Sequence, residues 1–477
     1  MNSFDQVVKN FRFLLFSEIV SKVFIFLNGS LIVRYLLAGK FGVLSFALAF
    51  TSILGIVMDL GLNLLIIREV SKEREGFARY FNNILTVKLI LALLIYIAAF
   101  CVLKLLGYSP EIRRVVYIMM FFAIFNSIVL TCNAMFQAFE KMEYQAGGVV
   151  FYNLLLFTGI ISGRALGLSV IGFAWIYSLA ALFLCFYSLI LYSVKIGNLK
   201  FSIEGKFLRR IIKMALPFFV IDSCVALYFY ADTVMLSLLV PDPEKSIGWY
   251  NAATRISLFL QFIPLVFSTA LFPLASRISI VSDGSLSRMH RRSVRLLSLI
   301  GIPLGFGISL FAEIIIKTVF GATYLPAAYS LRISIWATIL IFLTTPFTRL
   351  MFVLDKQFLV ARITLLFTAV TIFLNSLLIP HFGYIGASVS AVVGMSVSMI
   401  LSSVVAHRLG YPLYRKMYVD IAKIVLVGLF ASAAIKIFNA GTAISLFIFL
   451  CPNIYFFLRI IDKEERQYFK SIFRYRI

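Results

Sequence analysis

Apolar runs of about 20 residues repeat along the whole chain, separated by short charged or Pro- and Gly-containing breaks. A run of that length is what an α-helix needs to cross the hydrocarbon core of a bilayer. The pattern therefore predicts an all-α integral membrane protein with about fourteen transmembrane helices. The expected spans lie at about residues 11–33, 41–62, 82–103, 115–138, 146–163, 168–192, 213–238, 247–272, 293–316, 328–348, 358–379, 384–406, 418–437 and 441–459.

Composition favours one helical bundle in the membrane over soluble domains. Hydrophobic residues make up 61% of the 477 residues, charged residues 14%, and the mean hydropathy is +0.99. An average soluble domain has roughly 45–50% apolar and about 25% charged residues. No hydrophilic segment between the expected spans exceeds roughly 20 residues, which leaves little room for a soluble catalytic domain.

The formal net charge of +23 comes from an uneven distribution of Lys and Arg. If the N-terminus is cytoplasmic, most of the 44 basic residues fall in segments that are also cytoplasmic, and nine fall in the opposite loops. Membrane proteins hold their basic residues on the cytoplasmic side. The distribution predicts a multi-pass protein of the cell membrane with both termini cytoplasmic, and it explains the charge without a nucleic-acid partner.

An internal repeat is visible in two matched patterns. Residues 41–47 resemble residues 247–253, which lie 206 positions later, and Gly172 at the sixth span matches Gly386 at the twelfth. Gly followed by apolar residues is also common at helix starts in any membrane protein. We interpret the matches as two parallel six-helix repeats followed by two further helices. The expected domains are residues 1–200, residues 201–415, and residues 416–477 with a basic cytoplasmic tail.

Ionisable side chains within the spans are candidates for function, because each costs about 2.5–3.5 kcal/mol on insertion scales. Arg255 lies about 12 Å into its span, and a guanidinium offers a fork of donors that matches phosphate oxygens. Structural pairing with Asp232 is the alternative. Lys88 is a second candidate for substrate binding, although its long stem favours an ammonium that reaches the cytoplasmic surface.

Four further ionisable residues are candidates for substrate binding or ion coupling. They are Glu18 and Lys22 in the first span, Asp59 in the second and Asp222 in the seventh. Glu18 and Lys22 share one helix face, either as a structural salt bridge or as a cavity lining in which Lys22 binds substrate and Glu18 couples an ion. Asp59 either has a structural role, as a helix cap or as a partner of Arg68, or takes part in ion coupling. Asp222, like Asp232, can bind a proton or a cation if it is buried.

No cofactor is expected. The sequence lacks the G-x-x-x-x-G-K-[ST] motif that cradles nucleotide phosphates. His290, His381 and His407 are far apart, and the five cysteines form no C-x-x-C pair. The pattern therefore predicts no metal site.

Several short stretches, in this order along the chain, resemble the polysaccharide flippase family of the multidrug/oligosaccharidyl-lipid/polysaccharide transporter superfamily. They are Met58-Asp59-Leu60-Gly61 with Ile67-Arg68-Glu69, then residues 138–144, Tyr230-Ala231-Asp232-Thr233, residues 248–253, Leu271-Phe272-Pro273, Phe320-Gly321 to Tyr324, and residues 382–387. The resemblance implies a secondary transporter, not an enzyme. It implies alternating access, with a lipid-linked oligosaccharide held between the two halves.

From this resemblance we expect a flippase for a polyprenyl phosphate- or pyrophosphate-linked oligosaccharide, used in surface polysaccharide or glycoprotein biosynthesis. Its partners would be the lipid-linked oligosaccharide, membrane lipids, H⁺ or Na⁺, and glycan-assembly enzymes. Related peptidoglycan-precursor flippases carry several cavity arginines, whereas Arg255 is the one deep arginine expected here. The alternatives are an ion-coupled drug or metabolite exporter of the same architecture, and a membrane-embedded glycan ligase or polymerase.

Overall fold

The structure, a computed structural model, describes residues 3–268, 283–437, 444–445, 448–450 and 452–453. Within these residues the chain is helical apart from short turns and contains no strand. It divides into two compact units. The first comprises residues 1–255 and 375–384, and the second comprises residues 256–374 and 385–477.

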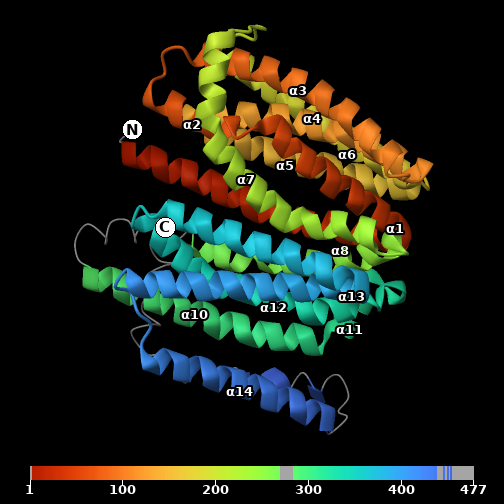
Figure 1. Ribbon diagram of the computed structural model, residues 1–477, viewed down its shortest axis with the longest axis vertical. Helices are drawn as coiled ribbons and strands as arrows, with labels where there is room; N and C mark the ends of the chain where they lie inside the picture. Colours follow the sequence, from red (N-terminus) through yellow and green to blue (C-terminus); the bar gives the residue numbers. More distant parts are fainter. Residues whose placement is uncertain (1–2, 269–282, 438–443, 446–447, 451, 454–477) are drawn as a thin grey trace. The chain divides into compact units, whose positions relative to one another are not determined.

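The first unit contains six complete long helices and one short one, all shown in Figure 1. They are α1 (Ser3–Asp59), α2 (Leu62–Lys72), α3 (Phe77–Leu105), α4 (Pro110–Ala138), α5 (Met142–Ala165), α6 (Val170–Lys195) and α7 (Gly205–Leu239). Most of α8 (Pro243–Leu260) also belongs to this unit. Helix α4 packs against α6, and α1 packs against α5 and α7.

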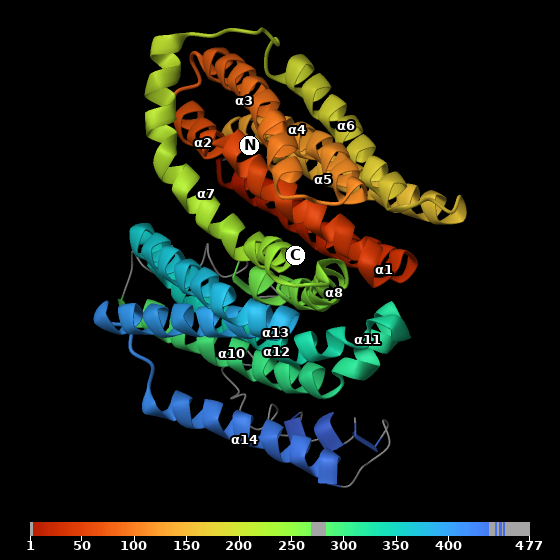
Figure 2. The ribbon, with the colours of Figure 1, turned by 45° about the vertical axis from the view of Figure 1, so that its right-hand side comes forward.

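The second unit is built from the later helices. They are α10 (Asp283–Leu310), α11 (Ala312–Phe320), the short 3₁₀ turn η1 (Ala322–Tyr324), α12 (Ala327–Val353), most of α13 (Gln357–Arg408), and α14 (Arg415–Ile437). Helix α10 packs against α12 on one side and α14 on another, and Figure 2 shows α14 running beside α10.

Ten helices of the described residues are long and apolar enough to cross a membrane, which confirms an all-α, multi-pass membrane protein. Two of them each hold two of the predicted spans. Helix α1 is interrupted at Leu37, where φ is 60°, and α13 is interrupted at Gly383, where φ is 54°. The last predicted span, at residues 441–459, lies largely outside the described residues.

The second predicted span ends earlier than expected, and a short helix follows it. Leu60 and Gly61 have φ of 45° and 69°, which no right-handed helix tolerates, so α1 stops at Asp59. Helix α2 then buries Leu62, Leu65 and other apolar residues on one face. At 11 residues it is too short to span a bilayer, so a search for apolar runs of span length missed it.

Each of the matched segments 41–47 and 247–253 contacts the residue three positions before the other. A Cβ built on Gly42 would overlap the backbone carbonyl oxygen of Glu244, and a Cβ on Gly248 would overlap that of Ala38. Each contact is the counterpart of the other, because 206 residues separate both Gly42 from Gly248 and Ala38 from Glu244. The recurring Gly is therefore needed for two helices to approach closely.

A second correspondence follows α4 and α12. Glu140 and Asp355 have φ of 58° and 56°, and the next residue in each case closes the same turn. The amide of Lys141 donates to the Phe136 carbonyl, and the amide of Lys356 donates to the Met351 carbonyl, both at 2.8 Å. Turns of one kind at a spacing of 215 residues are what a duplicated unit predicts. The boundaries at residues 200 and 415 stay a prediction.

Candidate functional site

A buried polar network surrounds Lys88, in the middle of the first unit. The Lys88 side chain is 2% exposed, and its ammonium lies 2.6 Å from Asp59 Oδ1, 2.8 Å from Asn63 Oδ1 and 2.7 Å from Thr131 Oγ1. The Ser127 carbonyl oxygen lies 3.2 Å away. Four protein oxygens thus converge on one cation inside a membrane helix bundle.

Local sequence brings these groups together. The Leu60-Gly61 turn places Asp59 at the end of α1 next to Asn63 in the first turn of α2. A Cβ on Gly61 would lie 2.7 Å from the Ala215 carbonyl oxygen, so the turn packs directly on the α7 backbone. Ser127 and Thr131 are one turn apart on α4. They face the pair from the other side, and Ser127 Oγ donates to Asp59 at 2.6 Å.

Two of the structural alternatives considered for these residues are wrong. The Lys88 ammonium does not reach the cytoplasmic surface, because it is bound by oxygens of α1, α2 and α4. Asp59 pairs with Lys88, while Arg68 Nε donates to Glu69 at 2.7 Å. Asp222 of α7 lies close enough to Asp59 for their carboxylates to interact electrostatically.

A second polar cluster surrounds Asp232. The Tyr250 hydroxyl donates to one carboxylate oxygen of Asp232, and the Asn375 amide donates to the other. Asp232 is 5% exposed, and the Asn375 side-chain oxygen is buried without a hydrogen-bond partner. The cluster thus combines a buried carboxylate with an unused acceptor beside it. Pairing of Asp232 with Arg255 is wrong, since α8 supplies Tyr250 instead.

Arg255 extends from α8 toward α1. Its guanidinium carbon lies 5.1 Å from the centre of the Phe41 ring, and a Cβ on Gly29 would overlap the guanidinium. The hydroxyl of Tyr177 on α6 lies close enough to interact electrostatically with it. The absence of a side chain at Gly29 therefore gives this half-buried cation its place between three helices. No carboxylate is an ion-pair partner of Arg255 among the residues the structure describes.

Glu18 and Lys22 lie on the first half of α1. Glu18 is exposed and Lys22 is half-buried. Both are described, and no ion pair joins them, so the structural salt bridge is wrong. The two charges are separate features of this helix.

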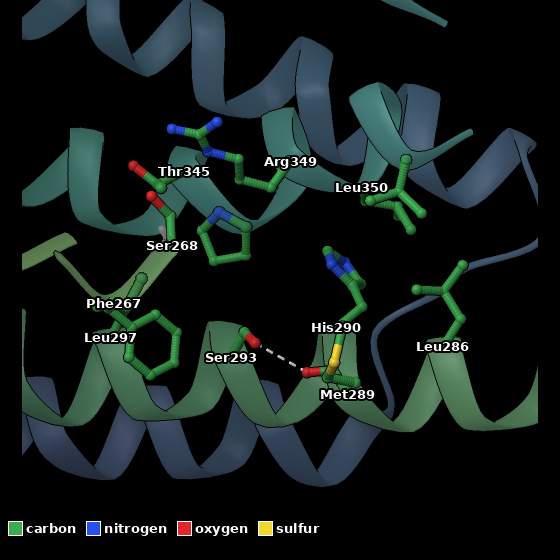
Figure 3. Close-up of a pocket in the computed structure, with 12 residues that line it drawn as sticks. Phe267, Ser268, Leu286, Met289, His290, Ser293, Leu297, Thr345, Arg349 and Leu350 are labelled. Atoms are coloured by element: carbon green, nitrogen blue, oxygen red, sulfur yellow. Dashed lines mark hydrogen bonds between the residues drawn. The ribbon is translucent and has the colours of Figure 1, made fainter. Parts of the chain in front are cut away.

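A small pocket in the second unit lies between α10 and α12 (Figure 3). Its volume is about 40 Å³, and it is lined by His290, Ser293, Pro346 and Arg349 among others. His290 is buried against the Phe347 ring, with centroids 5.0 Å apart. A space of this size can hold a water molecule but not a sugar ring.

A larger cavity of about 280 Å³ lies between α12 and α13 in the same unit. Several of its lining hydroxyls already donate to carbonyls of their own helices. Thr344 donates to Leu340 at 2.8 Å, and Thr364 donates to Val360 at 3.0 Å. Their remaining lone pairs can only accept, so the cavity suits water or a ligand that carries hydroxyl groups. Among the described residues, no group of three or more His, Cys, Asp or Glu side chains could hold a metal ion.

Sequence reasoning named Lys88, Asp59 and Asp232 but missed most of their partners. Asn63 lies between two of the stretches singled out by resemblance, and Tyr250 lies within another, on the helix that follows α7 directly. Asn375 comes from a distant helix, 143 residues after Asp232. The partners on α4 could have been predicted from sequence. Ser127 and Thr131 are polar, lie four residues apart on one helix face, and stand inside an apolar run. Lys22, Arg255, Glu18 and Asp222 are not joined to one another by any hydrogen bond or ion pair within the described chain.

Comparison with known proteins agrees with this architecture. A family model described as polysaccharide biosynthesis protein matches residues 7–279. Two curated proteins of Haloferax volcanii are similar to the chain. The probable low-salt glycan biosynthesis flippase Agl15 is 26% identical over 182 residues, and the probable flippase AglR is 28% identical over 184 residues. The chain spans 38% and 37% of these relatives' lengths, and the matches take up the same shares of the chain.

Solved structures share the fold over nearly the whole chain. The lipid II flippase MurJ in an inward closed conformation has a TM-score of 0.76 at 15% identity, and the match covers 92% of this chain and 97% of MurJ. An inward-facing multidrug resistance MATE family transporter has a TM-score of 0.64 at 14% identity and covers 81% of this chain and 95% of its own. Identities this low show the fold alone.

Proposed function

Since this chain belongs to the polysaccharide biosynthesis protein family, we propose that it is a flippase that moves a polyprenyl phosphate- or pyrophosphate-linked oligosaccharide across the cell membrane. The observation that carries the proposal is the family match over residues 7–279, the segment that contains Arg255 and the whole network around Lys88. The names of Agl15 and AglR support the same activity. The cargo serves surface polysaccharide or glycoprotein biosynthesis, and the glycan-assembly enzymes are partners.

The substrate's phosphate is bound by Arg255, with Lys22 as a second cation. Arg255 is half-buried and has aromatic rings rather than a carboxylate beside it, so its fork of donors is available for phosphate oxygens. Lys88 was expected to bind substrate, but its three N–H donors already face four protein oxygens. We therefore assign Lys88 a different role.

Transport proceeds by alternating access, with residues 1–200 rocking against residues 205–415. Both termini are cytoplasmic in this proposal, which the distribution of Lys and Arg supports. The coupling ion, H⁺ or Na⁺, binds at Asp232, where a buried carboxylate and the free oxygen of Asn375 are adjacent. Glu18 and Asp222 are secondary candidates. Asp59 is already neutralised by Lys88 and is the weakest of the four.

An ion-coupled drug or metabolite exporter is the second candidate, favoured by the likeness to MATE transporters. The two functions differ in what a deletion strain accumulates. Loss of a flippase leaves a finished lipid-linked oligosaccharide on the inner leaflet and depletes the surface glycan. Loss of an exporter leaves the surface glycan intact and changes drug or metabolite sensitivity. Analysis of lipid-linked intermediates in that strain therefore separates the two, and an unchanged intermediate pool would reject the flippase.

A further inference from the structure

The surroundings of Lys88 have the chemistry of a metal-ion site. The four oxygens near its ammonium are a carboxylate, a side-chain amide, a hydroxyl and a backbone carbonyl, from Asp59, Asn63, Thr131 and Ser127. These are the oxygen types that bind hard cations in proteins. The Thr131 hydroxyl also donates to the Ser127 carbonyl at 3.0 Å, which leaves its lone pairs for the cation.

More oxygens lie near the Lys88 ammonium than its N–H groups can bind by separate hydrogen bonds. An ammonium has three N–H donors, whereas four acceptors lie within 3.2 Å of Lys88 Nζ. At least one contact is therefore charge–dipole attraction, as in the coordination of an ion. A lysine ammonium is a compact point charge, so it can take the place of a monovalent cation.

We propose that these four oxygens form a monovalent-cation site whose permanent occupant is the tethered ammonium of Lys88. The ammonium neutralises Asp59, whose carboxylate also interacts electrostatically with the second carboxylate, Asp222. Because it is covalently attached to α3, it cannot leave during a transport cycle. The first unit thus carries its own cation, and any mobile coupling ion must bind elsewhere.

The proposal predicts that removing the ammonium creates a site for a free ion. In Lys88→Ala, the cage keeps its oxygens and gains space, so Na⁺ or K⁺ enters beside Asp59. The test is thermal unfolding of the purified full chain at matched ionic strength in NaCl, KCl or N-methylglucamine chloride. Wild type is measured in parallel, because an ion at Asp232 would shift both proteins equally.

We expect Lys88→Ala to unfold about 3 °C higher in NaCl or KCl than in N-methylglucamine chloride, beyond any shift of wild type. Lys88→Ala/Asp59→Asn should lose this extra shift, since the cage then lacks its charge. Lys104→Ala removes an exposed lysine from the end of the same helix and should behave as wild type. The proposal is overturned if Lys88→Ala shows no extra shift of its unfolding temperature. It is also overturned if Lys88→Ala/Asp59→Asn shows the same extra shift as Lys88→Ala.

If Lys88→Ala is too unstable to purify, size-exclusion chromatography of detergent extracts replaces thermal unfolding. The expected result is a monodisperse peak in NaCl or KCl and aggregation in N-methylglucamine chloride. The neutral pair Lys88→Met/Asp59→Asn serves as the reference and should be monodisperse in all three salts. Aggregation of Lys88→Ala in every salt while this pair is folded contradicts the proposal. None of these readouts requires flipping, so they do not depend on the proposed function.

Discussion

Gly42 on α1 meets the backbone of Glu244 on α8 so closely that any side chain at Gly42 would overlap the Glu244 carbonyl oxygen. Gly248 makes the equivalent contact with Ala38. This reciprocal crossing lies on the two helices that also carry Gly29 and Arg255. On α1 the two contacts lie on opposite sides of the interruption at Leu37, with Gly29 and the Arg255 guanidinium before it and the crossing at Gly42 after it.

Gly42→Ala and Gly248→Ala should each destabilise the protein by about 1–3 kcal/mol, because the added methyl group forces two backbones apart. Gly55→Ala is the matched control on α1, since a Cβ there meets no atom within 4 Å. It should be neutral or slightly stabilising, as Ala is the better helix former. Thermal unfolding in detergent checks all three, and equal midpoints for Gly42→Ala and Gly55→Ala would contradict the close crossing.

Asp232→Asn should abolish the effect of an H⁺ or Na⁺ gradient on transport, because the amide cannot hold the ion's charge. We expect the gradient-driven rate to fall at least about tenfold, equivalent to about 1.4 kcal/mol. Hydrogen bonds with Tyr250 and Asn375 can re-form around the amide, so folding should be retained. Asp242→Asn, which removes an exposed carboxylate before α8, is the control. A gradient response that survives in Asp232→Asn places the coupling ion elsewhere.

Arg255→Ala should weaken binding of the substrate's phosphate by about 2 kcal/mol, or roughly thirtyfold, the loss typical of a charged hydrogen bond. Arg255→Lys should recover only part of this, since an ammonium lacks the planar fork. Competition of a soluble polyprenyl-phosphate analogue against a fluorescent lipid-linked sugar gives the affinity. Arg114→Ala, an exposed arginine of α4, should bind as wild type. Matching affinities for Arg255→Ala and Arg114→Ala would remove Arg255 from the site.

The segment between α6 and α7 is held on α3 by three contacts. Asn83 Oδ1 accepts from the Glu204 amide at 2.8 Å, Asn82 Oδ1 accepts from the Lys200 amide at 3.0 Å, and Arg79 pairs with the Glu204 carboxylate. Hydrogen bonding from Arg79 lowers the pKa of Glu204 below its ordinary value of 4.5. The stabilisation from this pair is thus complete above about pH 4.5 and is lost as the pH falls through the lowered pKa.

Hydrogen exchange of residues 196–204 should accordingly be slow near neutral pH and, after correction for intrinsic rates, become faster only in acid. Glu204→Gln should exchange at neutral pH as the wild type does in acid. Because the pair is exposed, the effect should stay local and leave global unfolding unchanged. If residues 196–204 of the wild type stayed equally protected from hydrogen exchange in acid, Asn82 and Asn83 alone would hold the segment.

The span pattern could be predicted from sequence because hydrophobic length is a local property. Leu37 and Gly383 were correctly placed between spans, since polar or glycine-containing breaks surround both. The short helix α2 was missed because it is amphipathic and lies outside the apolar runs.

The partners of the buried charges could be predicted only in part. Lys88 was recognised as an unusual charge, but Asp59 is 29 residues away and Ser127 and Thr131 are about 40. Asn375 meets Asp232 across 143 residues. Such pairings depend on which helix faces pack together, and the apolar runs that reveal a span carry little information about its rotation.

The most direct test of the flippase proposal uses proteoliposomes that contain the purified protein and a fluorescent polyprenyl-pyrophosphate-linked oligosaccharide. A membrane-impermeant quencher reports the fraction of label in the outer leaflet over time. We predict that wild type moves the label of the inner leaflet to the outer leaflet, where the quencher reaches it. Arg114→Ala should do so at the same rate, and Arg255→Ala should be slower by roughly thirtyfold. Quenching that stops at the same level in wild-type and protein-free vesicles would contradict the proposal.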